Sequence, residues 1–197
     1  KINSPEVADV LIKTLSDDSF YVSYEATTIL GKIDSDDVRK KLLDCVDIKD
    51  RRTKGYIMLA IVFQEENLNK TLFTQEWHPY LLNSIRSDDR FVRGSAAISL
   101  VNIGFSSDNT QIIELMDKHL VPLLIEILSG KVYFKDYLAL RELGYKKLLA
   151  LTGQDIGYQM DKWWAWWHTN SVNFKAIRLL KGVSMEEAKS MSLEYQN

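Results

Sequence analysis

Cysteine, proline and glycine are scarce in this chain. Its 197 residues include one cysteine, three prolines and nine glycines. The lone cysteine, Cys45, excludes an intramolecular disulfide, so packing alone must hold the fold together. Cys45 lies in an apolar helical stretch, which favours a small buried hydrophobe over a reactive thiol. The prolines and glycines fall where helices start or stop, leaving long uninterrupted segments between them.

The sequence also lacks long apolar runs and a strong excess of either charge. No run approaches the roughly 18 residues of a membrane-spanning helix, so we expect no membrane span. With 25 basic and 27 acidic residues the net charge is −2, which does not favour nucleic acid as a partner. No signal peptide is visible and the chain begins at Lys1. The compartment stays open between the cytoplasm and a processed extracytoplasmic form.

The apolar residues that are present follow a helical pattern. They make up 46% of the chain, enough for one sizeable core. Valine, isoleucine, leucine and alanine recur at spacings of three and four, without a strand-like alternation long enough to build a sheet. The sequence therefore predicts an all-α fold.

One phrase of the sequence occurs twice. Val22, Ala26 and Leu30 recur 70 residues later as Val92, Ala96 and Leu100, each set preceded by an Asp-Asp pair. Seventy residues is about twice the length of a helical-hairpin repeat, which indicates a repeat architecture. We expect one domain over 1–197, with helix pairs at 5–33, 36–64, 76–105 and 109–152 and a C-terminal cap at 153–197. We also expect Pro122 to kink or divide the long helix that contains it.

Two motifs resemble those of a known family. The phrase Asp-Asp-x-x-Val-Arg-x-x-Ala-x-x-x-Leu, from Asp88 to Leu100, resembles a HEAT-type repeat. The phrase from Leu148 to Trp167, with its Leu-Thr-Gly and Trp-x-x-Trp-Trp, resembles a recurrent ending of bacterial HEAT-repeat proteins. The resemblance covers roughly residues 5 to 168. It implies a right-handed α–α superhelix of about four helix pairs, with the second helices lining a concave surface.

The same resemblance implies a binding function, because most family members bind other proteins. We therefore expect a non-enzymatic interaction module or scaffold whose partner is another protein or peptide, with self-association as a further option. Two alternatives stay open: a DNA-base-repair glycosylase of the HEAT class and a bilin-lyase-like protein. The acidic pI near 6.0 and the clustering of tryptophans at one end count against the first. The second rests on fold analogy alone.

Four tryptophans lie within five positions near the C-terminal end. On a helix Trp163, Trp166 and Trp167 share one face, and we expect them to cap the end of the core. Trp164 is turned away from that face, which makes it our candidate for contact with a partner. The other predicted docking residues are four from the second helices of the pairs: Tyr24, Lys54, Arg90 and Ser95.

The remaining candidates for chemistry have structural explanations. The acid pairs Asp17-Asp18, Asp36-Asp37 and Asp88-Asp89 recur at repeat turns, which is typical of helix N-capping. Arg93 and Arg141 occupy one repeat position, and we expect ion pairs or hydrogen bonds to turns in the neighbouring repeat, with Asp89 as a candidate partner for Arg93. The alternative is an anion-binding ladder on the concave face. The three histidines are far apart and form no metal motif, so we expect no catalytic, cofactor or metal residues.

Overall fold

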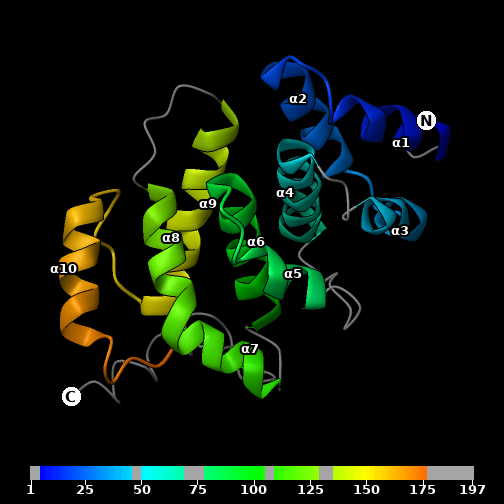
Figure 1. Ribbon diagram of the computed structural model, residues 1–197. Coiled ribbons are helices and arrows are strands. Elements are labelled where there is room, and N and C mark those ends of the chain that lie inside the picture. The colour runs from blue at the N-terminus through cyan, green and yellow to red at the C-terminus, as the bar shows by residue number, and fades with distance from the viewer. Residues whose placement is uncertain (1–4, 46–49, 69–77, 105–108, 129–134, 177–197) are drawn as a thin grey trace.

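The computed structural model describes residues 5–45, 50–68, 78–104, 109–128 and 135–176. All regular structure in these ranges is helical, without a strand, as the periodicity predicted. Figure 1 shows the helices following one another across the molecule, from α1 and α3 at one end to α10 at the other. The predicted cap at 153–197 is described as far as residue 176, and residues 177–197 lie outside the described residues.

The helices fall at the predicted positions, with small differences in length. The helix of the second pair, for example, runs four residues beyond the predicted end at 64. The bounds are α1 Pro5–Thr14, α2 Phe20–Leu30, α3 Asp36–Asp44, α4 Arg51–Leu68, α5 His78–Ser84, α6 Arg90–Gly104, α7 Thr110–Leu115, the π-helical turn η2 Met116–Leu120, α8 Val121–Leu128, α9 Lys135–Thr152 and α10 Met160–Asn170.

Neighbouring helices in the chain pack as pairs, and the second helices of the pairs pack in a row. The pairs are α1–α2, α3–α4, α5–α6 and α8–α9. Helices α2, α4, α6 and α9 contact one another in that order. In addition, α2 contacts α9, so the first and last members of the row meet. This last contact brings together residues from opposite ends of the chain.

Helices α4 and α6 are buried on almost every side. All seven residues from Tyr56 to Val62 are buried, and so are most side chains of α6. A helix that is apolar all round belongs in the interior of a protein, and the sequences of both helices fit that position. The rings of Tyr56 and Phe91 meet edge to face with centroids 5.2 Å apart. The centre of the core is therefore the contact between these two helices.

Polar side chains of α4 satisfy backbone carbonyls of the first pair. Gln64 is buried, and its Nε2 donates to the carbonyls of Leu30 and Ile33, at 3.0 and 3.1 Å. At the other end of α4, Arg52 donates to the carbonyl of Asp17 at 2.8 Å. Helix ends leave carbonyls without partners inside the helix, and burying them unpaired is costly. The second pair thus completes the hydrogen bonding of the first.

Arg93 bonds to the turn of its own pair and to helix α8 of the next pair, so the predicted bond to a turn of the neighbouring repeat was wrong, and its carboxylate partner also differs from the predicted one. Its guanidinium donates to the carbonyl of Ser87 at 2.7 Å and to Glu126 of α8 at 3.1 Å. Asp89 instead accepts from the backbone N–H groups of Phe91 and Val92, at 2.8 and 3.0 Å. The carboxylate is used as an N-cap of α6, so Asp89 as the partner of Arg93 was wrong.

The acid pair of the first repeat is used differently. Asp17 accepts from the backbone N–H of Ser19 at 2.8 Å, which closes the α1–α2 turn without capping α2 itself. The same sequence motif therefore stabilises the turn in one pair and the helix start in another.

The helix containing Pro122 is divided, as its sequence predicted. Helix α7 ends at Leu115, and the π-helical turn η2 joins it to α8, in which Pro122 is the second residue. Proline cannot donate to the preceding turn, so the helical hydrogen bonding changes there. The turn places the buried carboxylate of Asp117 against the end of the described chain. Its two oxygens accept from the N–H of Ala176 at 2.9 Å and from Lys175 Nζ at 3.0 Å.

Aromatic side chains cover the end of the core at α10. Trp163 and Trp167 are buried, and Trp166 is partly buried against the same core. Phe174 packs edge-on against Trp166 and Trp167, with ring centroids 5.9 and 5.3 Å apart. The side chains of Trp163 and Trp167 therefore take the capping position that their shared helix face indicated.

We expect Arg93→Ala to lower the free energy of unfolding by about 1–2 kcal/mol, because it removes one charge-assisted bond to a carbonyl and one to Glu126. The side chain of Arg93 is 24% exposed and that of Glu126 42%, so the loss is smaller than for a fully buried pair. Urea denaturation measures it. Lys146→Ala, which breaks an exposed ion pair with Glu142, is the control, and an equal loss in both variants would contradict the assignment.

Candidate functional site

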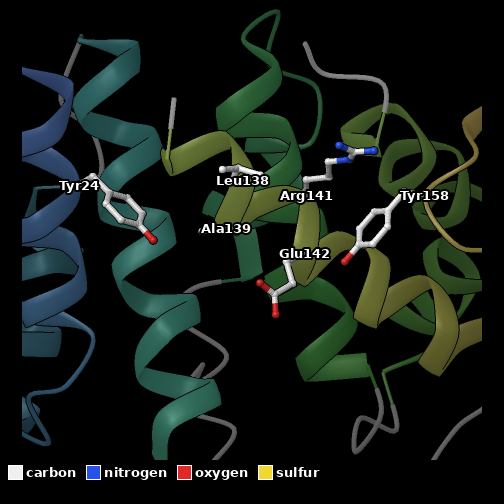
Figure 2. A pocket seen from close by; sticks show the side chains of 6 residues that line it. All are labelled: Tyr24, Leu138, Ala139, Arg141, Glu142 and Tyr158. Carbon is white, nitrogen blue, oxygen red and sulfur yellow. The ribbon is translucent and has the colours of Figure 1, made fainter. Parts of the chain in front are cut away.

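A groove lies where α2 approaches α9. Its volume is about 510 Å³. Figure 2 shows Tyr24 on one side of the groove and Tyr158 on the other, with the α9 side chains between them. The groove is lined by Tyr24 of α2, by Leu138, Ala139, Arg141 and Glu142 of α9, and by Tyr158 from the loop before α10.

The groove presents large apolar side chains to solvent. Leu138 is 52% exposed and Tyr158 43%, although both belong to residue types that are normally more buried. Tyr24 is partly buried, and its ring packs edge-on against Phe63 of α4, with centroids 6.4 Å apart. The surface is therefore apolar with a polar edge, as is common in binding sites.

The position of Tyr158 is fixed by its neighbours. Its ring stacks at a tilt on that of Tyr145, with centroids 4.5 Å apart, and the Arg141 guanidinium lies 4.9 Å from the ring centre. The indole N–H of the buried Trp163 donates to the carbonyl of Gly157 at 2.7 Å. A ring held in place by such contacts is pre-organised for binding, so less freedom is lost when a ligand binds.

The loop that carries Tyr158 depends on two glycines and one tyrosine hydroxyl. Gly153 and Gly157 have φ angles of 68° and 67°, in the left-handed region that side chains with a Cβ disfavour. The Tyr145 hydroxyl donates to the carboxylate of Asp155. This hydrogen bond to the carboxylate raises the pKa of Tyr145 above its usual value, so the hydroxyl stays protonated and the bond is kept at neutral pH.

The two charged residues of the groove differ in their pairing. Glu142 forms an exposed ion pair with Lys146, with 2.9 Å between nitrogen and oxygen. The Nε of Arg141 is buried and has no hydrogen-bond partner among the described residues. Burying an arginine N–H without an acceptor is unfavourable, so an added acceptor here would be stabilising. The groove therefore combines an apolar surface with an unsatisfied cationic donor.

The predicted docking residues do not form one surface. Tyr24 lines the α2–α9 groove, whereas Lys54 lines a separate polar pocket beside the α5–α6 turn. Arg90 is partly buried at the start of α6 and lines neither. Ser95 is fully buried, so its prediction as a docking residue was wrong. It fails because α6 is covered by helices on nearly all sides and leaves little surface for a partner.

Trp164 is not set apart from the other tryptophans. It is partly buried and packs against the core, as Trp166 also does, and its ring lies 6.0 Å from that of His168. Its role as a partner contact stays a prediction, and Trp164 is not among the residues that line the groove.

Sequence reasoning missed the groove residues Leu138 and Tyr158. Leu138 reads as an ordinary apolar position of a helix, and its exposure depends on where α2 lies. For Tyr158 a signal was present, because it directly follows the Gly153-x-Asp155-x-Gly157 segment of the C-terminal motif. The structure shows that this segment presents an aromatic ring at the surface.

The described part of the chain contains neither a metal-binding cluster nor a membrane-spanning helix. These residues include no group of three or more histidine, cysteine, aspartate or glutamate side chains placed to hold a metal ion. Among the same residues, no helix has the length and apolar character needed to cross a membrane.

No protein-family model matches this chain, and no curated protein does either.

We expect Gly157→Ala to lower the free energy of unfolding by about 1–2 kcal/mol, because alanine disfavours a positive φ. No atom lies within 4 Å of the added Cβ, so the effect is conformational and not steric. Gly157→Asn is the matched control, since asparagine tolerates this region better. Thermal or urea unfolding measures both variants. Equal losses for alanine and asparagine would contradict the explanation.

Cys45 is expected to react slowly with alkylating reagents. Its partial burial, and next the charges of Asp44 and Asp9, raise the pKa of the thiol, so less of the reactive thiolate is present at a given pH. Iodoacetamide at pH 8 should modify the folded chain more slowly than the urea-unfolded chain. Asp44→Asn should increase the rate for the folded chain. A folded rate above the unfolded one would indicate a reactive thiol instead.

Proposed function

We propose that this protein is a non-enzymatic protein-interaction module of the HEAT-repeat type, which binds a segment of another protein in the α2–α9 groove. The observation that carries the proposal is the groove itself, with half-exposed Leu138 and Tyr158 beside the unsatisfied Nε of Arg141.

The helix arrangement supports the repeat assignment. Four helix pairs occur in chain order, and their second helices pack in the row α2, α4, α6 and α9. A HEAT-like superhelix has this order of contacts, with the second helices on its concave side. The contact between α2 and α9 is consistent with a strongly curved row. In this proposal, the groove lies on the concave side.

The residue types in the groove favour a protein ligand. Tyrosine and arginine are enriched among residues that dominate protein interfaces, because they combine apolar area with hydrogen bonding. Tyr24, Tyr158 and Arg141 supply these types, and Leu138 adds an apolar contact. The groove opens at the surface and is long enough to involve two helices and a loop, which suits a peptide segment.

The charges define the chemistry of that segment. Arg141 needs an acceptor, and Glu142 is already paired with Lys146. A carboxylate of the ligand would meet the Arg141 guanidinium, which matches carboxylates in geometry and charge. An apolar or aromatic side chain next to it would cover Leu138. We therefore expect a segment that carries an acidic residue beside an apolar one.

The environment of Glu142 favours binding over catalysis. A carboxylate that catalyses proton transfer is usually shielded from solvent in a cleft. Glu142 is 59% exposed and ion-paired, which is an ordinary surface environment. The groove also presents one arginine rather than the several cations with which proteins bind a DNA backbone.

The proposal is tested by selecting a random peptide library on the immobilised chain. Enriched peptides should share an acidic residue next to an apolar one. Binding of the labelled peptides is then measured by fluorescence anisotropy. Arg141→Leu should weaken binding about 10-fold to 100-fold, as expected for loss of a charge-assisted hydrogen bond. Leu138→Asp should weaken it as well, through loss of apolar contact and repulsion of the acid.

Lys118→Leu is the matched control, because it removes one positive charge from an exposed residue that does not line the groove. It should leave peptide affinity unchanged. The proposal is wrong if no peptide family is enriched, or if Arg141→Leu binds as tightly as the control. Salt-sensitive binding of duplex DNA, or binding of a bilin, that is lost in Arg141→Leu would replace the peptide with that ligand.

A further inference from the structure

A second cavity lies beside the turn between α5 and α6 and is separate from the α2–α9 groove. Its volume is about 300 Å³. The start of α4 forms one wall, and the end of α5 with the following turn forms the other. The lining residues are Arg51 and Lys54 of α4, Asn83 and Ser84 of α5, Arg86, Ser87 and Asp88 of the turn, and Val92 of α6.

Positive charge is concentrated in this pocket. Arg51, Lys54 and Arg86 contribute three cationic groups against the single carboxylate of Asp88. None of the three cations forms an ion pair with a residue that the structure describes. Like charges placed together without counter-charges repel one another, so the pocket favours an anion.

The buried hydroxyl of Ser84 is a second and independent indication of a ligand. Ser84 is 1% exposed, and its Oγ has no hydrogen-bond partner among the described residues. Buried polar groups are nearly always paired, and an unpaired one calls for an explanation. Because Ser84 also lines the pocket, an acceptor bound there would lie next to a donor that lacks one.

Helix α4 separates two arginines that are adjacent in sequence. Arg52 is used structurally, since it bonds to the carbonyl of Asp17 in the first pair and its guanidinium lies 4.0 Å from the centre of the Phe20 ring. Arg51 and Lys54 stand three positions apart and so share a helix face, and both line the pocket. Arg52 therefore holds the first pair in place, whereas Arg51 and Lys54 face the pocket.

We propose that this pocket binds a phosphate monoester. Three cations and one carboxylate give a net charge of about two positive, which matches the charge of about −1.5 to −2 that a phosphate monoester carries at neutral pH. Arginine presents paired N–H donors that fit phosphate oxygens, and lysine adds a point charge. Ser84 supplies a hydroxyl donor. A carboxylate, with one charge and two oxygens, would use the site only in part.

The same chemistry has two sources: a small phosphorylated metabolite and a phosphoserine in a protein segment. We would titrate the full chain with inorganic phosphate, glucose 6-phosphate and a phosphoserine heptapeptide by isothermal titration calorimetry, with sodium chloride at matched ionic strength as reference. Saturable binding of a phosphate compound that chloride does not reproduce is expected. Tighter binding of the peptide assigns the site to a protein segment, and tighter binding of the sugar phosphate assigns it to a metabolite.

Variants locate the binding. Arg51→Gln combined with Arg86→Gln should weaken it at least tenfold, and Ser84→Ala a few-fold. Arg51 and Arg86 are exposed, so these changes should leave the fold intact, which circular dichroism verifies. Lys118→Gln, an exposed lysine outside the pocket, is the control and should change nothing. Amide resonances of Ser84 and Ser87 should shift on addition of the ligand.

Two results would overturn the proposal. One is that none of the three phosphate compounds binds saturably at concentrations up to about 10 mM. A dissociation constant above that value corresponds to less than about 3 kcal/mol of binding free energy. The other is binding by the double variant that equals binding by Lys118→Gln, which would place the phosphate elsewhere on the surface.

Discussion

The packing of α4 against α6 supports the rest of the molecule. Both helices are buried on nearly all sides, and the edge-to-face contact of Tyr56 with Phe91 lies at their junction. Every other pair is attached to this centre. Helix α2 packs on α4, and α8 and α9 pack on α6. Because these helices are covered on nearly all sides, a side chain of a different size in either one disturbs the helices packed on both sides of it. The two ends of the row are also positioned through this contact.

Several polar side chains hold the helix pairs together through hydrogen bonds to the backbone. Gln64 and Arg52 meet carbonyls of the first pair, and Asp117 holds the backbone beyond α10. Five buried side-chain atoms lack a hydrogen-bond partner among the described residues: Arg52 Nε, Gln64 Oε1, Ser84 Oγ, Ser95 Oγ and Arg141 Nε. Of these residues, Ser84 and Arg141 also line a cavity. A polar group that is left unsatisfied next to open space is where an external partner contributes most.

The sequence was a good guide to local structure. It was a poor guide to surfaces that form where helices from distant parts of the chain meet. The spacing of apolar residues was sufficient to predict the all-α fold and the approximate helix positions. The chemistry of proline was sufficient to predict the break before Pro122. The groove joins Tyr24 to Tyr158, and its existence depends on how the row of helices curves, which no local pattern specifies. The equivalent positions Arg93 and Arg141 show the same limit, since one meets Glu126 and the other a tyrosine ring. Ser95 was misplaced because serine and alanine in α6 do not reveal which side is covered.

The contact between α2 and α9 has a consequence for how binding and folding are related. The groove is built from Tyr24 of α2, four residues of α9 and Tyr158, so a fragment that lacks α2 or α9 does not contain it. A ligand bound there contacts both α2 and α9, the first and last helices of the row. By mass action, the ligand favours molecules in which every helix pair between α2 and α9 is in place. Occupancy of the groove would therefore suppress local unfolding of α2 and of α9 at the same time. Binding of this kind reports that the row from α2 to α9 is intact.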